Sequence, residues 1–127
     1  MRRVKDTRDV LARYYVYANA GDWDRWCDLF AADMVMDEQL AGRIEGRDTL
    51  RSMMAGMEEL YSSFENIPSH FLVDGDEAAV VSHISARSAS GAPIEAAAMN
   101  YFRIENGLIT YLANHHDTLP FQVLSQS

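Results

Sequence analysis

The sequence predicts an α+β protein in which a curved antiparallel sheet wraps around three N-terminal helices and encloses a deep apolar pocket. Helical spacing of apolar residues dominates up to about residue 64, and long strands with hairpin signals follow. Helices followed by strands in this way favour the α+β class. The length of 127 residues suits one domain with a real core, so we expect a single domain over residues 1–127.

The first helix is predicted over residues 3–19, where apolar residues recur at helical spacing. Gly21 ends this helix, and Asp22 is placed to cap a short second helix by accepting its free N–H groups. The second helix carries a heavy aromatic load in Trp23, Trp26 and Phe30. These two helices are expected to form one side of the pocket.

A strand is predicted at residues 34–36, followed by a charged loop over residues 37–46. Asp48 is expected to cap a third helix, whose apolar stripe continues to Phe64. Met53 and Met57 lie on that stripe. Because methionine adapts to irregular shapes, this wall either faces a ligand or is ordinary core.

Four strands are predicted over residues 65–73, 77–88, 93–105 and 108–117. The connections contain Asp74-Gly75, Ser90-Gly91 and Asn106-Gly107. Asn-Gly and Asp-Gly pairs supply the positive φ angles of two-residue hairpins. The strands should therefore form an antiparallel meander. The tail from Leu119 to Leu124, with Phe121, is expected across the pocket mouth or on a partner subunit.

Composition excludes several classes of protein. The net charge of −8 argues against a nucleic-acid binder, which needs a basic face. No apolar run approaches the roughly 18 residues of a membrane span, and the start lacks the apolar centre of a secretory signal. Cys27 is the only cysteine, so no intrachain disulfide forms, and a buried apolar role suits it best. We expect a cytoplasmic protein with no membrane contact.

The chain resembles the nuclear transport factor 2-like superfamily, and in particular its SnoaL-like polyketide cyclase branch. The resemblance lies in Tyr-Tyr-x-x-x-Asn-Ala-Gly-Asp-Trp, in Leu-Phe-Ala-x-Asp before a strand, in Glu-Gly-Arg-Asp-x-Leu-Arg, and in Tyr-Phe-Arg-Ile-Glu-Asn-Gly-Leu-Ile. It implies a cone-shaped fold and a homodimer formed through the open face of the sheet. That fold hosts cyclases, isomerases, dehydratases, epoxide hydrolases and non-catalytic modules, so it does not determine function.

Similarity to the ketosteroid isomerases suggests one set of pocket residues. Tyr14 falls where that family keeps an oxyanion-hole tyrosine, Glu38 on its carboxylate base, and Asn100 on its protonated aspartic acid. A carboxylate facing neutral hydrogen-bond donors can abstract a proton and stabilise the resulting enolate. Phe102 shares the strand face of Asn100 and is expected beside the substrate. Alternatively, Glu38 is a solvated strand end and Tyr14 a packed core residue.

Similarity to scytalone dehydratase suggests a second set. His70 and His83 resemble that enzyme's histidine pair, while Asn19 and Glu38 occupy the positions of its aspartate and tyrosine. Side chains alternate faces along a strand, so both histidines can enter one cavity, or each can be a core or rim residue. Asn19 contacts substrate or ends the first helix. A histidine near neutral pKa can remove an α-proton and return it to a departing hydroxyl.

Similarity to the polyketide cyclases points to the last strand, where an acid acts as base. Asp117 is the nearest match, and His116 precedes it. His115 and His116 are adjacent and face opposite ways, so at most one of them enters the pocket. His116 and Asp117 are therefore expected among the substrate contacts.

These comparisons lead to two hypotheses of different class. The first is a cofactor-independent acid–base enzyme that cyclises, dehydrates or isomerises a small hydrophobic carbonyl compound of secondary metabolism through an enol-type intermediate. His83 and His70 would shuttle protons, Glu38 would act as base or orient a histidine, and Tyr14 and Asn100 would stabilise the oxyanion. The second is a non-catalytic ligand-binding or dimerisation module. Epoxide hydrolysis ranks third. It needs a relay of acid, arginine and acid, and although Arg103 and Asn114 lie near suitable strands, the second acid is missing. No metal-ligand cluster is evident.

Overall fold

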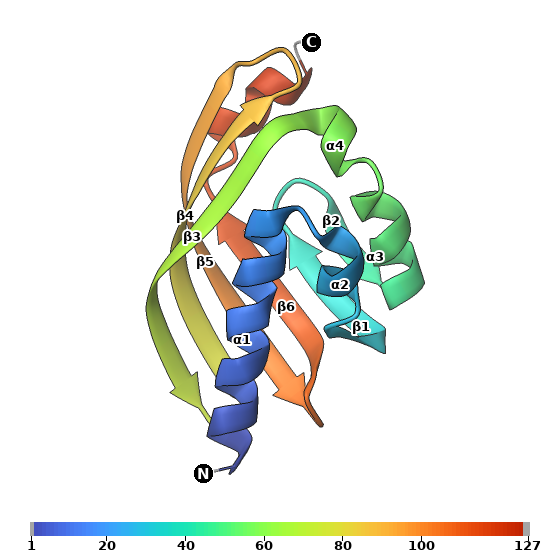
Figure 1. Cartoon of the computed structure of the whole chain (residues 1–127), viewed down its shortest axis with the longest axis vertical. Coiled ribbons are helices and arrows are strands. Elements are labelled where there is room, and N and C mark those ends of the chain that lie inside the picture. Colours follow the sequence, from blue (N-terminus) through green and yellow to red (C-terminus); the bar gives the residue numbers. More distant parts are fainter. Residues whose placement is uncertain (1, 126–127) are drawn as a thin grey trace.

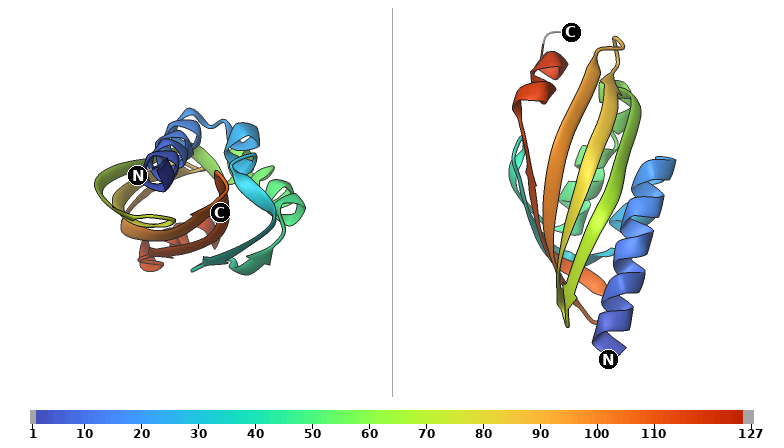
Figure 2. Two further views of the ribbon diagram at one scale, coloured as in Figure 1. Left: turned by 90° about the horizontal axis from the view of Figure 1, so that it is seen from below. Right: turned by 90° about the vertical axis from the view of Figure 1, so that its left-hand side faces the viewer.

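A six-stranded sheet with the order β2-β1-β6-β5-β4-β3 forms the body of the protein. The computed structural model describes residues 2–125, with side chains from residue 6 onward. The sheet curves around the N-terminal helices, with α1 along its concave side (Figure 1). Viewed along the cone, β2 and β3 remain separate edges, so the sheet is not closed (Figure 2). The predicted α+β fold class is confirmed.

The first two helices form as predicted. Helix α1 spans Arg2–Ala20 and buries Leu11, Tyr14 and Tyr15 against the sheet. Helix α2 spans Trp23–Cys27, and the Asp22 side chain accepts a hydrogen bond from the backbone N–H of Arg25 at 3.2 Å. This bond satisfies one of the free donors at the helix start.

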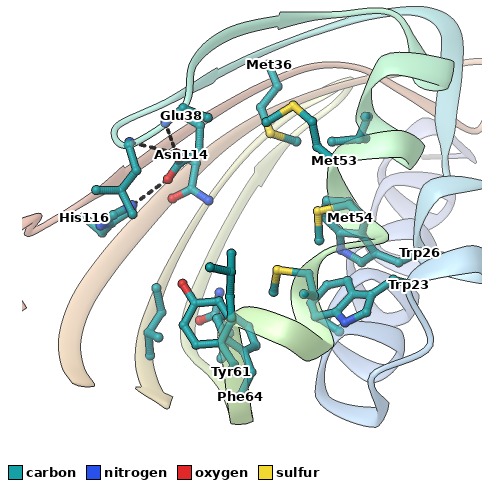
Figure 3. A pocket seen from close by; sticks show the side chains of 18 of the residues that line it. Trp23, Trp26, Met36, Glu38, Met53, Met54, Tyr61, Phe64, Asn114 and His116 are labelled. Atoms are coloured by element: carbon teal, nitrogen blue, oxygen red, sulfur yellow. Dashed lines mark hydrogen bonds and ion pairs between the residues drawn. The ribbon is translucent and has the colours of Figure 1, made fainter. Parts of the chain in front are cut away.

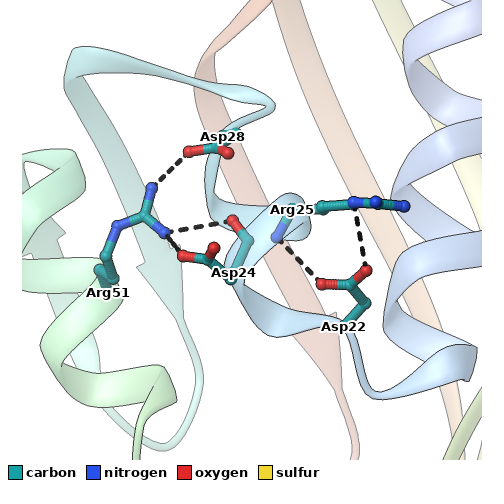
Figure 4. A network of polar contacts seen from close by, with 5 residues as sticks. All are labelled: Asp22, Asp24, Arg25, Asp28 and Arg51. Atoms are coloured by element: carbon teal, nitrogen blue, oxygen red, sulfur yellow. Dashed lines mark hydrogen bonds and ion pairs between the residues drawn. The ribbon is translucent and has the colours of Figure 1, made fainter.

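Ion pairs hold the second and third helical segments together (Figure 4). Arg51 of α3 contacts the Asp24 carboxylate and donates to Asp28 at 2.5 Å. It also donates to the backbone carbonyl of Asp24 at 3.2 Å. One guanidinium of α3 therefore bridges two carboxylates, one from α2 and one from its C-terminal end.

The third helix differs from the prediction. The chain forms α3 over Arg47–Met54 and α4 over Met57–Leu60, and strand β3 already begins at Tyr61. Gly56 lies at the break, where glycine weakens helix continuity because it loses more conformational entropy on becoming helical than any other residue. Gly46, with φ +91°, precedes the first turn in place of the predicted cap Asp48. Phe64 consequently belongs to a strand and not to a helix.

One strand is longer than predicted, and one strand was not predicted at all. Strand β1 spans Phe30–Glu38 and pairs with β2, Gly42–Glu45, in a segment predicted to be a loop. Strand β1 also pairs in parallel with β6, so the sheet is mixed and not wholly antiparallel. Glu38 lies opposite Asn114 of β6 in this pairing. The parallel pair brings the end of β1 beside the end of the last strand.

The predicted meander is confirmed. Strands β3 (Tyr61–Asp74), β4 (Glu77–Ser88), β5 (Pro93–Glu105) and β6 (Leu108–His116) pair antiparallel in sequence order. Asn106 and Gly107 both have positive φ, at 54° and 77°, as their hairpin requires.

The tail lies against the cone and not free in solvent. It forms a 3-10 helix, η1, over Leu119–Ser125 and packs on β5. Phe121 is buried in a small cluster with Ile84, Ile94 and Ala96, separate from the main core around α1. One end of the sheet is therefore filled by α1 and its partners, and the other end by the tail.

Candidate functional site

A cavity of about 370 Å³ lies between the helices and the concave face of the sheet. This volume falls within the usual range for small-molecule sites. Figure 3 shows tryptophan and methionine side chains along one side and a polar group along the other. The lining is formed by Tyr14, Ala18, Trp23, Trp26, Met36, Glu38, Leu40, Ala41, Ile44, Leu50, Met53, Met54, Met57, Leu60, Tyr61, Phe64, Asn66, Ile84, Asn114, His116, Phe121 and Leu124.

Glu38 and His116 form an ion pair in the polar part of this cavity. His116 Nε2 lies 2.7 Å from Glu38 Oε1, and the side chains are only 2% and 17% exposed. Glu38 Oε2 accepts hydrogen bonds from the backbone N–H groups of Leu40 and Ala41, both at 2.7 Å. A carboxylate has about four acceptor positions. Three are thus used by the protein, and one on Oε1 is left.

The contacts of His116 favour its charged form. Its Nδ1 lies 2.9 Å from the backbone carbonyl of Asp117, while Nε2 faces Glu38. A neutral imidazole has only one N–H, so either tautomer would direct a lone pair at an oxygen. The imidazolium donates to both oxygens and avoids this repulsion. The Phe121 ring packs on the imidazole, with centroids 4.7 Å apart.

The pKa values of the pair move apart as this geometry requires. For Glu38, burial alone would raise the pKa, but hydrogen bonds from His116, Ala41 and Leu40 outweigh it and lower the pKa. For His116, burial alone would lower the pKa, but the bonds to Glu38 and to the Asp117 carbonyl outweigh it and raise the pKa. Both shifts favour the charged forms, the carboxylate of Glu38 and the imidazolium of His116.

Two tyrosines in the lining remain neutral hydroxyl groups. Burial raises the pKa of Tyr14 well above its ordinary value, and the charges of Tyr15 and Glu38 act in the same direction. Burial and the charge of Glu38 raise the pKa of Tyr61 to about 12. Both hydroxyls can therefore donate hydrogen bonds at physiological pH.

Five residues predicted from the sequence do line the cavity. They are Tyr14, Glu38, Met53, Met57 and His116. Their roles toward a ligand stay predictions. The expectation that one of the two adjacent histidines enters is met by His116, while His115 lies outside and contacts Gln39 at 3.3 Å.

The expected placement of His70 and His83 inside the cavity is wrong. Both are exposed, and neither lines it. His83 Nε2 lies 2.7 Å from Glu95 Oε1 on the outer face of the sheet, with the two side chains 54% and 58% exposed. Strand β4 presents Ser82 and Ile84 inward, so the alternation of faces turns His83 outward.

Four further predicted residues lie outside the lining. Asn100 is fully buried behind it and donates to the Tyr15 hydroxyl at 3.2 Å, and Phe102 packs edge-on against Tyr14 in the core. Asp117 is exposed, and its carboxylate accepts the Leu119 N–H at 3.0 Å. Asn19 binds the backbone of β3. Each of these side chains therefore has a contact within the protein, although the Oδ1 of Asn100 has no hydrogen-bond partner among the residues described.

Tyr61 and Asn66 line the cavity but were not named as candidates from the sequence, and Asn114 was named only for an epoxide hydrolase relay. Asn114 is two residues before His116 and therefore shares its strand face, a signal that the sequence did contain. The sequence contained no signal for Asn66, because the alternation of side chains along a strand does not show which face lies inside.

The described part of the chain contains no group of three or more His, Cys, Asp or Glu side chains that could hold a metal ion. No helix within residues 2–125 is long and apolar enough to cross a membrane.

The fold and cavity define a cone-shaped α+β protein with one ion pair in an apolar pocket. The sequence profile of the SnoaL-like domain matches residues 11–112. The chain therefore belongs to the SnoaL-like domain family of the nuclear transport factor 2-like superfamily. No curated protein matches the sequence significantly.

Solved structures share this fold over nearly the whole chain. TerC, crystallised with polyporic acid, has a TM-score of 0.83 and 16% identity, over 96% of this chain and 99% of its own. A Sinorhizobium meliloti protein provisionally named a polyketide cyclase has a TM-score of 0.70 and 25% identity, over 84% and 94%. An epoxide hydrolase of M. tuberculosis has a TM-score of 0.82 and 15% sequence identity, over 97% of this chain and 92% of its own. The differing names show that this fold serves several chemistries.

Proposed function

We propose that this protein is a cofactor-independent general acid–base enzyme acting on a small, largely apolar, carbonyl-bearing metabolite. The reaction class is cyclisation, dehydration or isomerisation through an enol-type intermediate. The observation that carries the proposal is the Glu38–His116 pair, held at 2.7 Å in the lining of an otherwise apolar cavity. Structural relatives named for cyclase and epoxide hydrolase chemistry are consistent with an enzyme of this family.

Glu38 is the proposed base. The remaining acceptor position on its Oε1 takes a proton from the carbon next to the substrate carbonyl. The C–H bond breaks, its electron pair forms the enolate, and Glu38 holds the proton. Tyr14 or Tyr61 donates a hydrogen bond to the enolate oxygen. The proton then returns to carbon in an isomerisation, or to a departing hydroxyl in a dehydration.

His116 is the proposed positioning residue for this base. Its proton fixes Glu38 Oε1 and lowers the Glu38 pKa, so the base is ionised at neutral pH but weak. A weak base removes a proton efficiently only from an acidic carbon. The proposal therefore favours a substrate whose reacting carbon is activated by more than one group, as in a 1,3-dicarbonyl compound.

The test uses 5-nitrobenzisoxazole, a small neutral bicyclic compound. Removal of its ring C–H proton breaks the N–O bond and releases a coloured phenolate. The wild-type protein should accelerate this step over buffer, and Glu38→Gln should lower the rate by more than ~10²-fold. Glu95→Gln, which alters the exposed carboxylate of the outer sheet face, is the matched control and should leave the rate unchanged. Equal rates for Glu38→Gln and wild type would contradict the role of Glu38.

A second candidate is a non-catalytic small-molecule-binding or dimerisation module of the same fold. The observation in its favour is that both ring nitrogens of His116 and three acceptor positions of Glu38 are already used by the protein. Trp23 and Trp26 line the cavity, so a bound probe should quench their fluorescence. Saturable quenching by 5-nitrobenzisoxazole without acceleration would favour this candidate over the enzyme.

A further inference from the structure

Three side-chain atoms in the lining residues lack a hydrogen-bond partner within the described chain. They are Trp26 Nε1, Asn66 Oδ1 and Asn114 Oδ1, each buried. A buried polar group without a partner costs folding free energy, because it has lost its hydrogen bonds to water. Asn114 lies beside the Glu38–His116 pair (Figure 3), so it belongs to the polar part of the cavity where the proposed reaction takes place. Asn66 has no role in the proposed reaction, so its unpaired oxygen needs another explanation.

Asn66 is held in place by Asn19, at the C-terminal end of α1. The Asn19 side chain accepts a hydrogen bond from the Asn66 N–H at 2.6 Å and donates one to the Asn66 carbonyl at 3.0 Å. These two bonds bind the backbone of Asn66 and leave its side-chain amide unused. Asn66 is only 5% exposed, whereas its neighbour Ile67 is 49% exposed on the other face of β3. The clamp therefore fixes the amide on the cavity side.

Asn66 and Glu38 reach the cavity from opposite parts of the sheet. Asn66 belongs to β3, an edge strand, and Glu38 belongs to β1, which lies beyond β4, β5 and β6 in the sheet order. A ligand that spans the cavity therefore meets polar groups from both sides. No Lys or Arg belongs to the lining among the residues described, and His116 is paired with Glu38. An anionic group would thus remain without a cation, which favours an uncharged ligand.

We propose that Asn66 is a second ligand-binding residue, that its amide bonds an uncharged hydroxyl or carbonyl group away from the reacting carbon, and that Asn19 is its positioning residue. An amide can rotate to present either its oxygen or its NH₂ group, so it serves a hydroxyl or a carbonyl equally. The substrate class is then a neutral, apolar skeleton with two separated polar groups. This inference rests on the proposed function only in assuming that the ligand of Asn66 is also the substrate of Glu38.

The test compares 2-naphthol with 2,6-dihydroxynaphthalene, two neutral probes that differ by one distal hydroxyl. Affinities are measured by titration calorimetry and by tryptophan quenching. The wild type should bind the diol about tenfold more tightly, on the scale of one hydrogen bond to an otherwise unpaired buried group. Asn66→Leu, which matches asparagine in shape, should remove this preference. Asn19→Ala should weaken it and lower the melting temperature, because β3 loses two bonds.

Thermal unfolding separates a binding role from a structural one. If the Asn66 amide serves a ligand, Asn66→Leu should raise the melting temperature of the free protein by a few degrees, because it removes an unpaired buried group. Asn100→Leu is the control: the Asn100 Oδ1 is also unpaired within the described chain, but its Nδ2 donates to Tyr15 and the residue lies outside the lining. This variant therefore loses a hydrogen bond, should not melt higher than the wild type, and should keep the diol preference.

Two results would overturn the inference. One is an Asn66→Leu protein that retains the preference for the diol, and the other is an Asn66→Leu protein that melts below the wild type. The proposed reaction fails independently, in the rate assay with Glu38→Gln. That variant should change the affinity for both naphthol probes by a similar factor and leave their ratio intact, so the two failures are distinguishable.

Discussion

Glu38→Gln should reverse the direction in which the pKa of His116 is displaced. A glutamine carbonyl can still accept the two backbone N–H groups of Leu40 and Ala41, so the local turn is retained. Its NH₂ group then faces His116 Nε2, which can accept a hydrogen bond only if it carries no proton. Burial, the largest influence on the pKa of His116, acts to lower it and is then opposed by Asp117 alone. The pKa should fall below its ordinary value of 6.5.

The magnitude follows from the contact that is lost. A hydrogen bond to a charged group contributes about 1.5–3 kcal/mol, and the pair is almost wholly removed from water. Glu38→Gln should therefore lower the free energy of unfolding by about 1.5–3 kcal/mol near pH 6. For a chain of this length the melting temperature should fall by roughly 5–10 °C.

The difference should depend on pH with a definite sign. Because the His116 pKa is raised in the folded state, its contribution is complete below pH 6.5 and is lost as the pH rises through the folded pKa. The Glu38 pKa is lowered, so its contribution is present above its ordinary value of 4.5 and is lost as the pH falls through the folded pKa. The gap between wild type and variant should thus be largest near pH 5–6 and smaller at pH 9.

The assay is an NMR titration of the four histidine rings, assigned by single His→Gln variants, together with urea unfolding at pH 6 and pH 9. Glu95→Gln is the control. It removes the carboxylate of the His83 pair, which has the same 2.7 Å separation but lies in solvent. Exposed pairs contribute little, so its unfolding midpoint should not move. A variant at Glu38 whose His116 titrates at or above the wild-type pKa would refute the reasoning.

The remaining predictions concern the tail and the outer face. Phe121→Ala should lower the free energy of unfolding by about 2–4 kcal/mol, because it empties a buried site against His116. Urea unfolding measures this, with Phe121→Leu as the milder control, and a loss below about 1 kcal/mol would show that η1 is not firmly packed. We also propose a homodimer through the outer sheet face, where Leu72, Met99 and Ile67 are 75%, 50% and 49% exposed. Met99→Glu should then give a monomer in light scattering, whereas a monomeric wild type would contradict the proposal.

Local chemistry in the sequence was sufficient for most of the fold. Asp22 caps α2 and Asn106-Gly107 turns the last hairpin because each residue type acts on its own backbone. The observed boundaries of β4 and β5 equal the predicted ones, because the same local turn signals flank both strands. The helix break at Gly56 and the short strand β2 escaped prediction, since both depend on packing against distant segments.

The candidate site shows where sequence reasoning ends. Glu38, Tyr14 and His116 were selected and do line the cavity. The period of two along a strand groups residues by face, but it does not say which face is inside. Strand β4 offers small or apolar residues on both faces, including Val80 inward and Val81 outward, so the sequence alone could not orient His83.

The sequence by itself determined the fold class, the first two helices, the hairpins and the supply of acid and base groups. Only the tertiary structure decided which groups meet. The parallel pairing of β1 with β6 brings Glu38 to His116 across 78 residues, and the clamp from Asn19 crosses 47 residues to Asn66. Such contacts follow from how the whole sheet curves around α1, and no short stretch of residues contains that information.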